Sequence, residues 1–209
     1  MAGTLALTGS HRELATCDPA MAALIEVHGP RSAEERRDPG RDGFAALARI
    51  VTGQQVSTAA AGTIWGRIRE EFGGRDPRAE EAAAGETRLR SCGLSGRKAS
   101  YIAGLGREIA EGRIDPDALE GASDEAVIEE LVALKGIGRW SAEMFLMFHL
   151  GRHDVFSPGD LGLRNGIQVA LDLDRRPSPE EAAEIAERWR PNRTLASIYL
   201  WAAASGPPA

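Results

Sequence analysis

Hydrophobic residues recur along most of the chain at the three- and four-residue spacing of a helix face. No run alternates hydrophobic and polar residues as a half-buried strand does. Phe44, Leu47, Ile50 and Val51 form one such helix face. Further helices are predicted over residues 57–72, 95–112, 123–134, 140–150, 178–189 and 194–204. The pattern predicts an all-α protein of about eight to ten helices joined by short loops.

The first strong helix start lies at Asp18-Pro19, where a capping side chain precedes a proline suited to the first turn. We therefore predict one domain over residues 18–209, preceded by a partly flexible segment over residues 1–17. No linker, repeat or low-complexity tract divides the chain further.

Composition narrows the class of protein. With 43% hydrophobic and 27% charged residues in 209, the chain has the balance of a soluble globular protein. It contains no apolar run long enough to span a membrane, and Met1–Gly9 lacks the regions of a secretory signal. Cys17 and Cys92 are too few for a disulfide framework or a four-cysteine iron–sulfur cluster. We expect a cytoplasmic protein, associated with the nucleoid if the source is prokaryotic.

The net charge of −6 argues against a nucleic-acid partner only as a sum, because the charges are segregated. Residues 88–107 hold five cations and no acid, whereas residues 115–130 hold seven acids and no cation. A basic strip can therefore meet a duplex while the acidic stretch faces away from it.

Gly136-Ile137-Gly138 joins two helix-patterned segments, so residues 123–150 read as a helix-hairpin-helix. Glycine permits the positive φ and close backbone approach of a tight turn, and Ile137 can plug the core. Backbone amides of such a turn and of the next helix N-terminus can bind a phosphate. An ordinary helix connection with a glycine cap explains the hairpin equally well.

The hairpin is one of several segments that together resemble the helix-hairpin-helix DNA glycosylase superfamily. Within it, the chain resembles the alkylpurine (3-methyladenine) DNA glycosylases of the AlkA type. The segments that carry the resemblance lie in this order: 44–57, 93–99, the hairpin, 154–164 and 187–201. The resemblance implies two helical subdomains with the active-site cleft between them, in a compact form without the N-terminal β-domain of some relatives.

Asp160 follows a Pro-Gly loop and matches the catalytic aspartate of that family. A fixed carboxylate near C1′ stabilises the oxocarbenium-like sugar of glycosidic cleavage and can orient or deprotonate water. The alternative reading is a plain helix cap, and both roles can coexist. The resemblance places Trp140 where bifunctional relatives carry a lysine nucleophile. This predicts a monofunctional enzyme without lyase activity.

The resemblance also implies a base pocket. Trp140 and Trp201 match positions that stack on a cationic alkylated base, while Met144 and Leu161 occupy positions that are aromatic in some relatives. Core packing is the alternative for each tryptophan, and we assign it to Trp65 and Trp189.

Flipping a base out of the duplex leaves a gap that a protein side chain fills. The family places this wedge at Gln55, next to Gln54; the alternative is that both glutamines cap or bridge helices. Phosphate contacts are expected from the hairpin residues Gly136, Ile137 and Gly138. They are also expected from the cationic residues Arg97, Lys98 and Arg193. The resemblance further allows a monovalent Na⁺ or K⁺ ion on the backbone of Gly136 and Gly138.

The sequence thus predicts a monomeric glycosylase that excises alkylated purines from double-stranded DNA in base-excision repair, with no required cofactor and no membrane partner. Two alternatives remain open. One is a non-catalytic helix-hairpin-helix module that binds DNA or a lesion. The other is a glycosylase for uracil, hypoxanthine or an oxidised purine.

Overall fold

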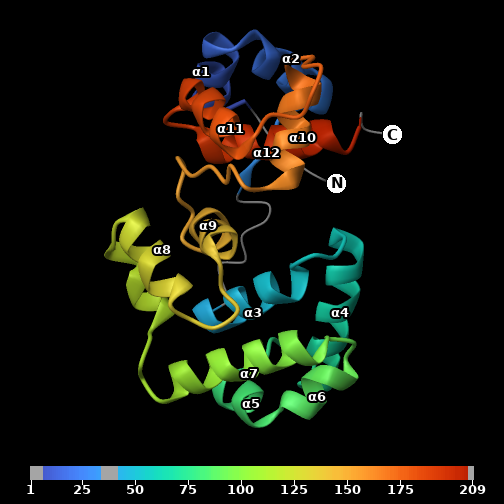
Figure 1. Cartoon of the computed structure of the whole chain (residues 1–209), viewed down its shortest axis with the longest axis vertical. Helices are drawn as coiled ribbons and strands as arrows, with labels where there is room; N and C mark the ends of the chain where they lie inside the picture. Colours follow the sequence, from blue (N-terminus) through green and yellow to red (C-terminus); the bar gives the residue numbers. More distant parts are fainter. Residues whose placement is uncertain (1–6, 34–41, 207–209) are drawn as a thin grey trace. The chain divides into compact units, whose positions relative to one another are not determined.

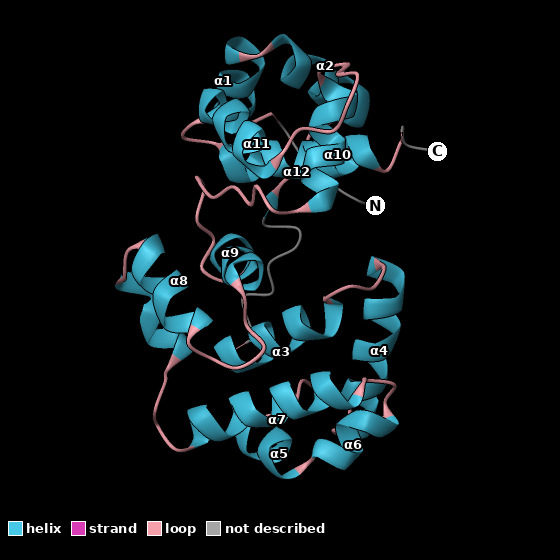
Figure 2. Cartoon of the chain, viewed as in Figure 1, coloured by secondary structure: helices cyan, strands magenta, loops and turns pink. Residues whose placement is uncertain are grey.

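The computed structural model describes residues 7–33 and 42–206, and within these ranges it contains helices and loops but no strand (Figures 1 and 2). Contacts divide the chain into two units. The terminal unit comprises the described residues of Met1–Arg37 and of Gly151–Ala209, and the central unit those of Asp38–Leu150. No helix in the described ranges has the length and apolar character needed to cross a membrane.

The terminal unit brings the two ends of the chain into one helical bundle. Its elements are α1 (Gly9–Cys17), α2 (Pro19–His28), α10 (Leu161–Ala170), α11 (Pro179–Ala186), the 3-10 turn η3 (Glu187–Trp189) and α12 (Arg193–Ala204). Helix α12 packs along α10 and α2. The core contains Met21, Leu163, Trp189, Tyr199 and Leu200, all fully buried. Helix α10, whose first turn follows Asp160, is therefore anchored by its buried face.

Two expectations for this unit have different outcomes. Asp18 caps α2 by accepting a hydrogen bond from the Ala20 amide at 2.9 Å, as predicted. The segment before it does not stand apart from the domain, because it forms α1 and buries Leu14 in the core at 1% exposure. Residues 1–6 of that segment lie outside the described ranges. Sequence reasoning missed α1 because Leu14 is its only buried large apolar residue.

The central unit is built around α7, which packs between α3 and the α5–α6 pair (Figure 1). Its elements are α3 (Gly43–Gly53), α4 (Thr58–Glu71), α5 (Ala79–Ala84), α6 (Glu86–Ser91), α7 (Gly96–Ala110), the 3-10 turn η2 (Pro116–Gly121), α8 (Asp124–Val132) and α9 (Arg139–Phe148). The short helices α5 and α6 were not predicted, because six residues are too few to show a helical period.

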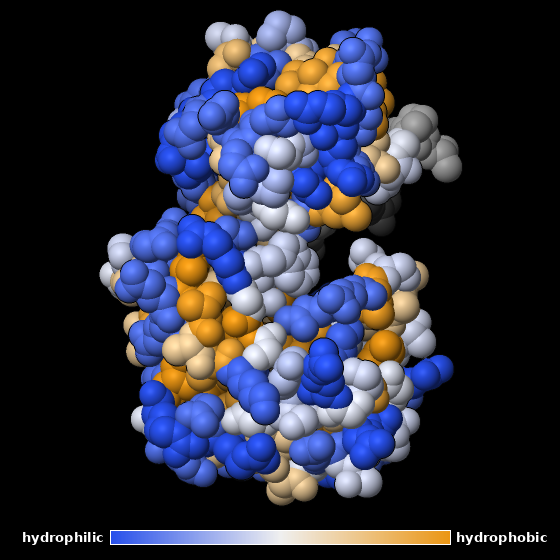
Figure 3. Space-filling view, in the orientation of Figure 1, coloured by the Kyte–Doolittle hydropathy of each residue, from blue (hydrophilic) through white to orange (hydrophobic). Residues whose placement is uncertain are grey.

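Side-chain caps start most of the helices that the hydrophobic pattern predicts. Ser57, Ser95, Ser123 and Ser178 each accept a hydrogen bond from an amide of the helix that follows. On the face seen in Figure 3, each unit is mainly hydrophilic, with smaller hydrophobic areas between polar residues. The two tryptophans assigned to the core are buried there, Trp65 at 5% and Trp189 at 0% exposure, which confirms that assignment.

Candidate active site and hairpin

Asp160 lies at the start of α10 with its carboxylate held in place by two donors. Its Oδ1 accepts a hydrogen bond from the Leu163 amide at 2.8 Å and another from Trp201 Nε1 at 3.0 Å. The first bond is the helix cap, and the second comes from α12, 41 residues away in sequence. The cap reading is confirmed, and the carboxylate is also fixed from a second helix.

Gly162 makes this arrangement possible. A Cβ at this position would lie 2.9 Å from Trp201 Cδ1 and 3.1 Å from Asp160 Oδ1. Any side chain there would push the indole away from the carboxylate, because the first distance is shorter than any normal contact. The Asp-x-Gly spacing at 160–162 is therefore a sequence signal for the contact between Asp160 and Trp201, which sequence analysis did not detect.

A carboxylate in this setting can act on a reacting centre beside it. It is half-buried, and Leu161 next to it is 52% exposed, so the start of α10 presents both a charged and an apolar group. Two hydrogen bonds to one oxygen limit reorientation of the carboxylate. The geometry suits electrostatic stabilisation of a developing positive charge or orientation of a water molecule.

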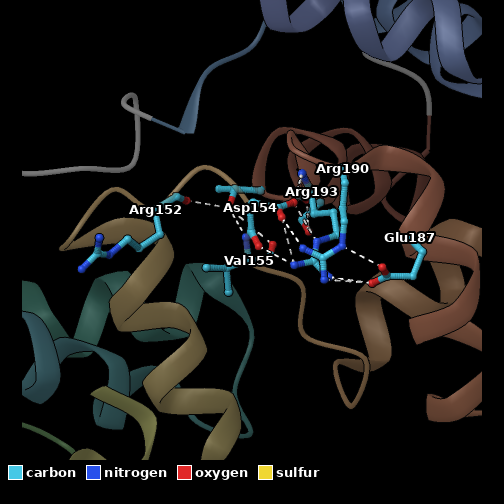
Figure 4. A network of polar contacts seen from close by, with 8 residues as sticks. Arg152, Asp154, Val155, Glu187, Arg190 and Arg193 are labelled. Atoms are coloured by element: carbon cyan, nitrogen blue, oxygen red, sulfur yellow. Dashed lines mark hydrogen bonds and ion pairs between the residues drawn. The ribbon is translucent and has the colours of Figure 1, made fainter. Parts of the chain in front are cut away.

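The loop before Asp160 is tied to the first turn of α12 by an ion-pair network (Figure 4). Arg193 donates from Nε to Asp154 Oδ1 at 2.7 Å, from Nη2 to the Asp154 carbonyl at 2.7 Å and from Nη1 to Glu187 at 2.9 Å. Arg190 contacts the same two carboxylates. Thr194 continues the attachment, since its amide donates to the His153 carbonyl and its hydroxyl to the Arg152 carbonyl.

This network corrects the prediction that Arg193 contacts phosphate. Its side chain is only 15% exposed, and the two carboxylates neutralise its charge. Asp154 lies 39 residues before Arg193, so no local pattern could reveal the pair. Arg193 instead fixes the loop that leads to Asp160.

The residues predicted to form the base pocket fall into two sets in different units. Asp160, Leu161 and Trp201 adjoin one another in the terminal unit. Trp140 and Met144 lie one turn apart on α9 in the central unit, where Trp140 is half-buried and Met144 is 5% exposed. The hydrogen bond between Trp201 and Asp160 joins the first set, and spacing along α9 brings the second set together.

The hairpin follows the sequence prediction at Gly136 and departs from it at Gly138. Gly136 has a φ of +92°, and a Cβ there would lie 2.3 Å from the Tyr101 ring of α7. Gly138 has an extended φ of −103° and serves as the N-cap of α9 without a capping side chain. Ile137 is 6% exposed and plugs the core as expected.

The amide of Ile137 does not support the predicted phosphate contact. It donates to the Leu134 carbonyl at 3.1 Å, which closes the turn. This corrects the assignment for Ile137. The amides that follow Gly138 at the start of α9 remain the hairpin groups suited to an anion, because no side chain caps them.

The two carbonyls predicted to bind a monovalent ion each accept one hydrogen bond, and the ion stays a prediction. The Gly136 carbonyl already accepts a hydrogen bond from Gln54 Nε2 at 2.9 Å, and the Gly138 carbonyl accepts one from the Ala142 amide at 3.1 Å. Each oxygen therefore has only one lone pair left for a cation.

The two glutamines of the predicted wedge have different environments. Gln55 is exposed at the tip of the turn after α3, with a φ of +56°. Gln54 points to the hairpin, where Nε2 donates to the Gly136 carbonyl at 2.9 Å and contacts Ser141 Oγ at 3.0 Å. This corrects Gln54 to a bridging role, as the alternative reading held, and leaves Gln55 as the wedge candidate.

The two neighbouring cations predicted to bind phosphate also differ. Arg97 is exposed in the first turn of α7 and pairs with no residue in the described part of the chain. Lys98 is half-buried, and its Nζ donates to the carbonyls of Thr52 at 2.9 Å and Gln54 at 2.6 Å. Burial lowers the pKa of Lys98. This corrects Lys98 from a phosphate contact to a group that holds the turn after α3.

Comparisons with known proteins show the family to which the chain belongs. A family model described as the HhH-GPD superfamily of base excision DNA repair proteins matches residues 48–191. DNA-3-methyladenine glycosylase 1 of Schizosaccharomyces pombe is 32% identical over 201 residues, which cover 93% of this chain and 86% of that protein.

Two solved structures share the fold. The 3-methyladenine DNA glycosylase of S. pombe in complex with abasic DNA superimposes with a TM-score of 0.85 at 31% identity, covering 93% of this chain and 95% of that one. A DNA-3-methyladenine glycosidase from Bacillus halodurans gives a TM-score of 0.77 at 34% identity, covering 95% and 90%. The chain therefore belongs to the HhH-GPD superfamily of base excision DNA repair proteins, and its all-α fold is that of the superfamily's glycosylases.

Proposed function

We propose that this chain is a monofunctional DNA glycosylase that hydrolyses the N-glycosidic bond of alkylated purines in double-stranded DNA, as a step of base-excision repair. Relatives named DNA-3-methyladenine glycosylases that align over most of the chain support the reaction and the substrate class. The observation that carries the proposal is the Asp160 carboxylate, held at the start of α10 by the Leu163 amide and the Trp201 indole.

Hydrolysis of the N-glycosidic bond of an alkylated purine requires few catalytic groups besides this carboxylate. An alkylated purine such as 3-methyladenine or 7-methylguanine carries a positive charge and leaves as a neutral base with the electrons of the glycosidic bond. Positive charge then develops at C1′ of the sugar, where the ionised Asp160 stabilises it. The same carboxylate orients the water that adds to C1′ and can accept its proton.

The flipped base requires apolar and aromatic contacts. In the central unit, Trp140 offers an electron-rich face that attracts a cationic purine, and Met144 supplies apolar surface one turn away on α9. In the terminal unit, Leu161 is the exposed apolar residue next to Asp160. Trp201 donates its indole N–H to Asp160, so its main role is to position the carboxylate.

The proposal excludes a Schiff-base mechanism because Trp140 stands where bifunctional relatives have the attacking lysine. Lys135 lies five positions earlier, exposed in the hairpin turn, and Lys98 is bound to backbone carbonyls. The product is then an intact abasic site, and strand nicking without added alkali would contradict this part of the proposal.

We propose further that the protein binds DNA as a monomer through the amides at the start of α9 and through Arg97, with Gln55 as the wedge. Hydrolysis by Asp160 needs no cofactor. A Na⁺ or K⁺ ion at the hairpin stays a prediction, to be tested by exchanging KCl for tetramethylammonium chloride in a DNA-binding assay.

The test is release of free bases from methylated duplex DNA, followed by chromatography. Wild type is expected to release 3-methyladenine and 7-methylguanine. Asp160→Asn is expected to release neither, although asparagine still caps α10 and preserves the fold. Asp174→Asn removes an exposed carboxylate of the same unit and is the matched control, expected to match wild type.

Two outcomes would favour the alternatives. Binding to damaged duplex without any base release would indicate a non-catalytic module. Release of uracil, hypoxanthine or an oxidised purine in place of the alkylated bases would indicate a glycosylase for another lesion.

A further inference from the structure

The turn after α3 holds Gln55 in a backbone conformation that glutamine rarely adopts. Its φ of +56° is one of two positive values among non-glycine residues in the described ranges. A left-handed residue with a Cβ is disfavoured relative to extended or helical conformations, so it persists only where the surroundings impose it. The exposed side chain of Gln55 gives no such restraint within its own turn.

Lys98 supplies one restraint from α7. Its ammonium donates to the carbonyls of Thr52 and Gln54 at the C-terminal end of α3, which lack helical partners. The Gln54 carbonyl shares a peptide plane with the Gln55 amide. Rotation of that plane changes ψ of Gln54 and φ of Gln55 together, so a hydrogen bond of 2.6 Å to this oxygen restrains the left-handed conformation directly.

Gln54 supplies the second restraint from the hairpin. Its side-chain amide contacts the Gly136 carbonyl and Ser141 Oγ, which joins the turn to both sides of the hairpin bend. Tyr101, one helical turn after Lys98 on α7, lies against Gly136 so closely that no Cβ fits between them. One face of α7 therefore contacts the Gln55 turn through Lys98 and the hairpin through Tyr101.

We propose that Lys98 and Gln54 are positioning residues that hold Gln55 in its left-handed conformation and at a fixed distance from the phosphate-binding hairpin, so that Gln55 enters the duplex as the damaged base leaves it. This inference rests on the proposed function. As positioning residues, neither Lys98 nor Gln54 contacts the substrate. Lys98 acts on the backbone of the turn, and Gln54 acts on the hairpin.

Base extrusion is the physical reason for holding Gln55 in place through Lys98 and Gln54. The hairpin must hold the strand while a side chain fills the gap, because an unfilled gap leaves the extruded state unfavourable. If the turn samples other conformations, only a fraction of the protein is competent, and the apparent affinity for the extruded state falls by that fraction. The loss affects extrusion, and it spares phosphate binding and bond cleavage.

The first measurement separates positioning from phosphate binding. Lys98→Met keeps the aliphatic stem and removes the ammonium, and Arg97→Met makes the matched change at the exposed neighbour. Binding to a duplex with a tetrahydrofuran abasic-site analogue is titrated by fluorescence anisotropy over a range of KCl concentrations. We expect the slope of log K against log[KCl] to fall by about 0.9 in Arg97→Met and to stay unchanged in Lys98→Met. An equal fall in both variants would overturn the proposal.

The second measurement tests extrusion itself. A 2-aminopurine opposite the abasic-site analogue reports insertion of the wedge through its fluorescence. Lys98→Met and Gln54→Met are each expected to need about tenfold more protein for the same signal, because the left-handed turn becomes a minor conformer. Insertion at the wild-type protein concentration in both variants would refute the proposal that Lys98 and Gln54 position Gln55.

The third measurement uses excision of 7-methylguanine in single-turnover conditions. With the lesion paired to cytosine, both variants are expected to be about tenfold slower than wild type at subsaturating protein. With the lesion opposite an abasic site, where extrusion costs less, the deficit is expected to shrink to about twofold. Equal deficits on the two substrates would overturn the proposal, since general damage to the fold gives that result.

Two features keep the test decisive. If Lys98→Met fails to fold by circular dichroism, Gln54→Met still cuts the link to the hairpin and carries the same expectations. If wild type releases no base, the proposed function fails, but the binding and 2-aminopurine measurements still decide whether Lys98 and Gln54 position the wedge.

Discussion

Replacing Trp201 by phenylalanine separates two roles that one side chain could fill. The substitution removes the N–H that donates to Asp160 Oδ1 at 3.0 Å and keeps an aromatic ring in the same place. If Trp201 acts by holding the carboxylate, the variant loses rate on every substrate. If it acts by stacking on a cationic base, the loss is specific to charged bases.

The size of the effect follows from the hydrogen bond. A bond to a charged acceptor contributes about 1.5–3 kcal/mol. Asp160 and Trp201 are both half-buried, which places the contact near the lower end of that range. A loss of ~1.5 kcal/mol of transition-state stabilisation lowers kcat about tenfold. KM is expected to change little, because the contact does not involve the ground-state base.

The assay compares single-turnover excision of cationic 7-methylguanine with that of neutral hypoxanthine, with Trp140→Phe as the control. Trp201→Phe should slow both reactions by the same factor, about tenfold. Trp140→Phe keeps an aromatic ring but loses the larger indole face, which contributes cation–π attraction. Trp140→Phe should therefore slow the cationic substrate more than the neutral one.

The positioning role of Trp201 is refuted if Trp201→Phe behaves as Trp140→Phe does. A selective loss on 7-methylguanine, with hypoxanthine excised at the wild-type rate, would show that the indole stacks on the base. The hydrogen bond to Asp160 would then have no catalytic consequence.

Three further substitutions test other parts of the structure. Gly136→Ala should lower the free energy of unfolding, measured in urea, by about 2–5 kcal/mol. This is the cost of a left-handed alanine plus the cost of its steric overlap with an aromatic ring of α7. Arg193→Met should lower kcat several-fold by releasing the loop held at Asp154, while the slope of log K against log[KCl] for DNA binding stays at the wild-type value. A shallower slope would show that Arg193 contacts a phosphate after all. Trp189→Phe should cost about 1.5–3 kcal/mol in urea, because Asp18, 3% exposed, loses a donor at 2.8 Å.

The parts of the fold that sequence could predict are those with a local signal. Ser95 starts α7 and Asp18 starts α2 because a cap and the first apolar turn lie within a few residues of each other. The helix α1 carries no comparable signal, since Leu14 is its only buried large apolar residue, and it packs on α2 as well as on the distant α12 and η3. Helices whose stability comes from distant partners stay invisible to periodicity.

The same division applies to the site. The loop that ends in Asp160 has a local pattern, and the structure places it at a helix start as expected. The roles of Lys98, Gln54 and Arg193 depend on partners between 39 and 87 positions away. Residue type alone suggested phosphate contacts for the two cations, since an unpaired cation and a paired one look alike in sequence.

Charge counting fails for the same reason. From the sequence, the run over residues 88–107 predicts a strip of five cations that meets DNA. In the structure Arg88 pairs with a glutamate of α4, Arg107 reaches a carbonyl of α5, and Lys98 holds the turn after α3. Arg90 and Arg97 are the two members of the run that have no side-chain partner in the described ranges. Counterion release depends on cations that meet phosphates, so we expect this run to contribute less to DNA affinity than its five cations predict, alongside the helix N-terminal amides and insertion at the lesion. A basic run that keeps two unpaired cations in the described ranges can thus contribute to binding at a damaged site while it holds undamaged duplex weakly.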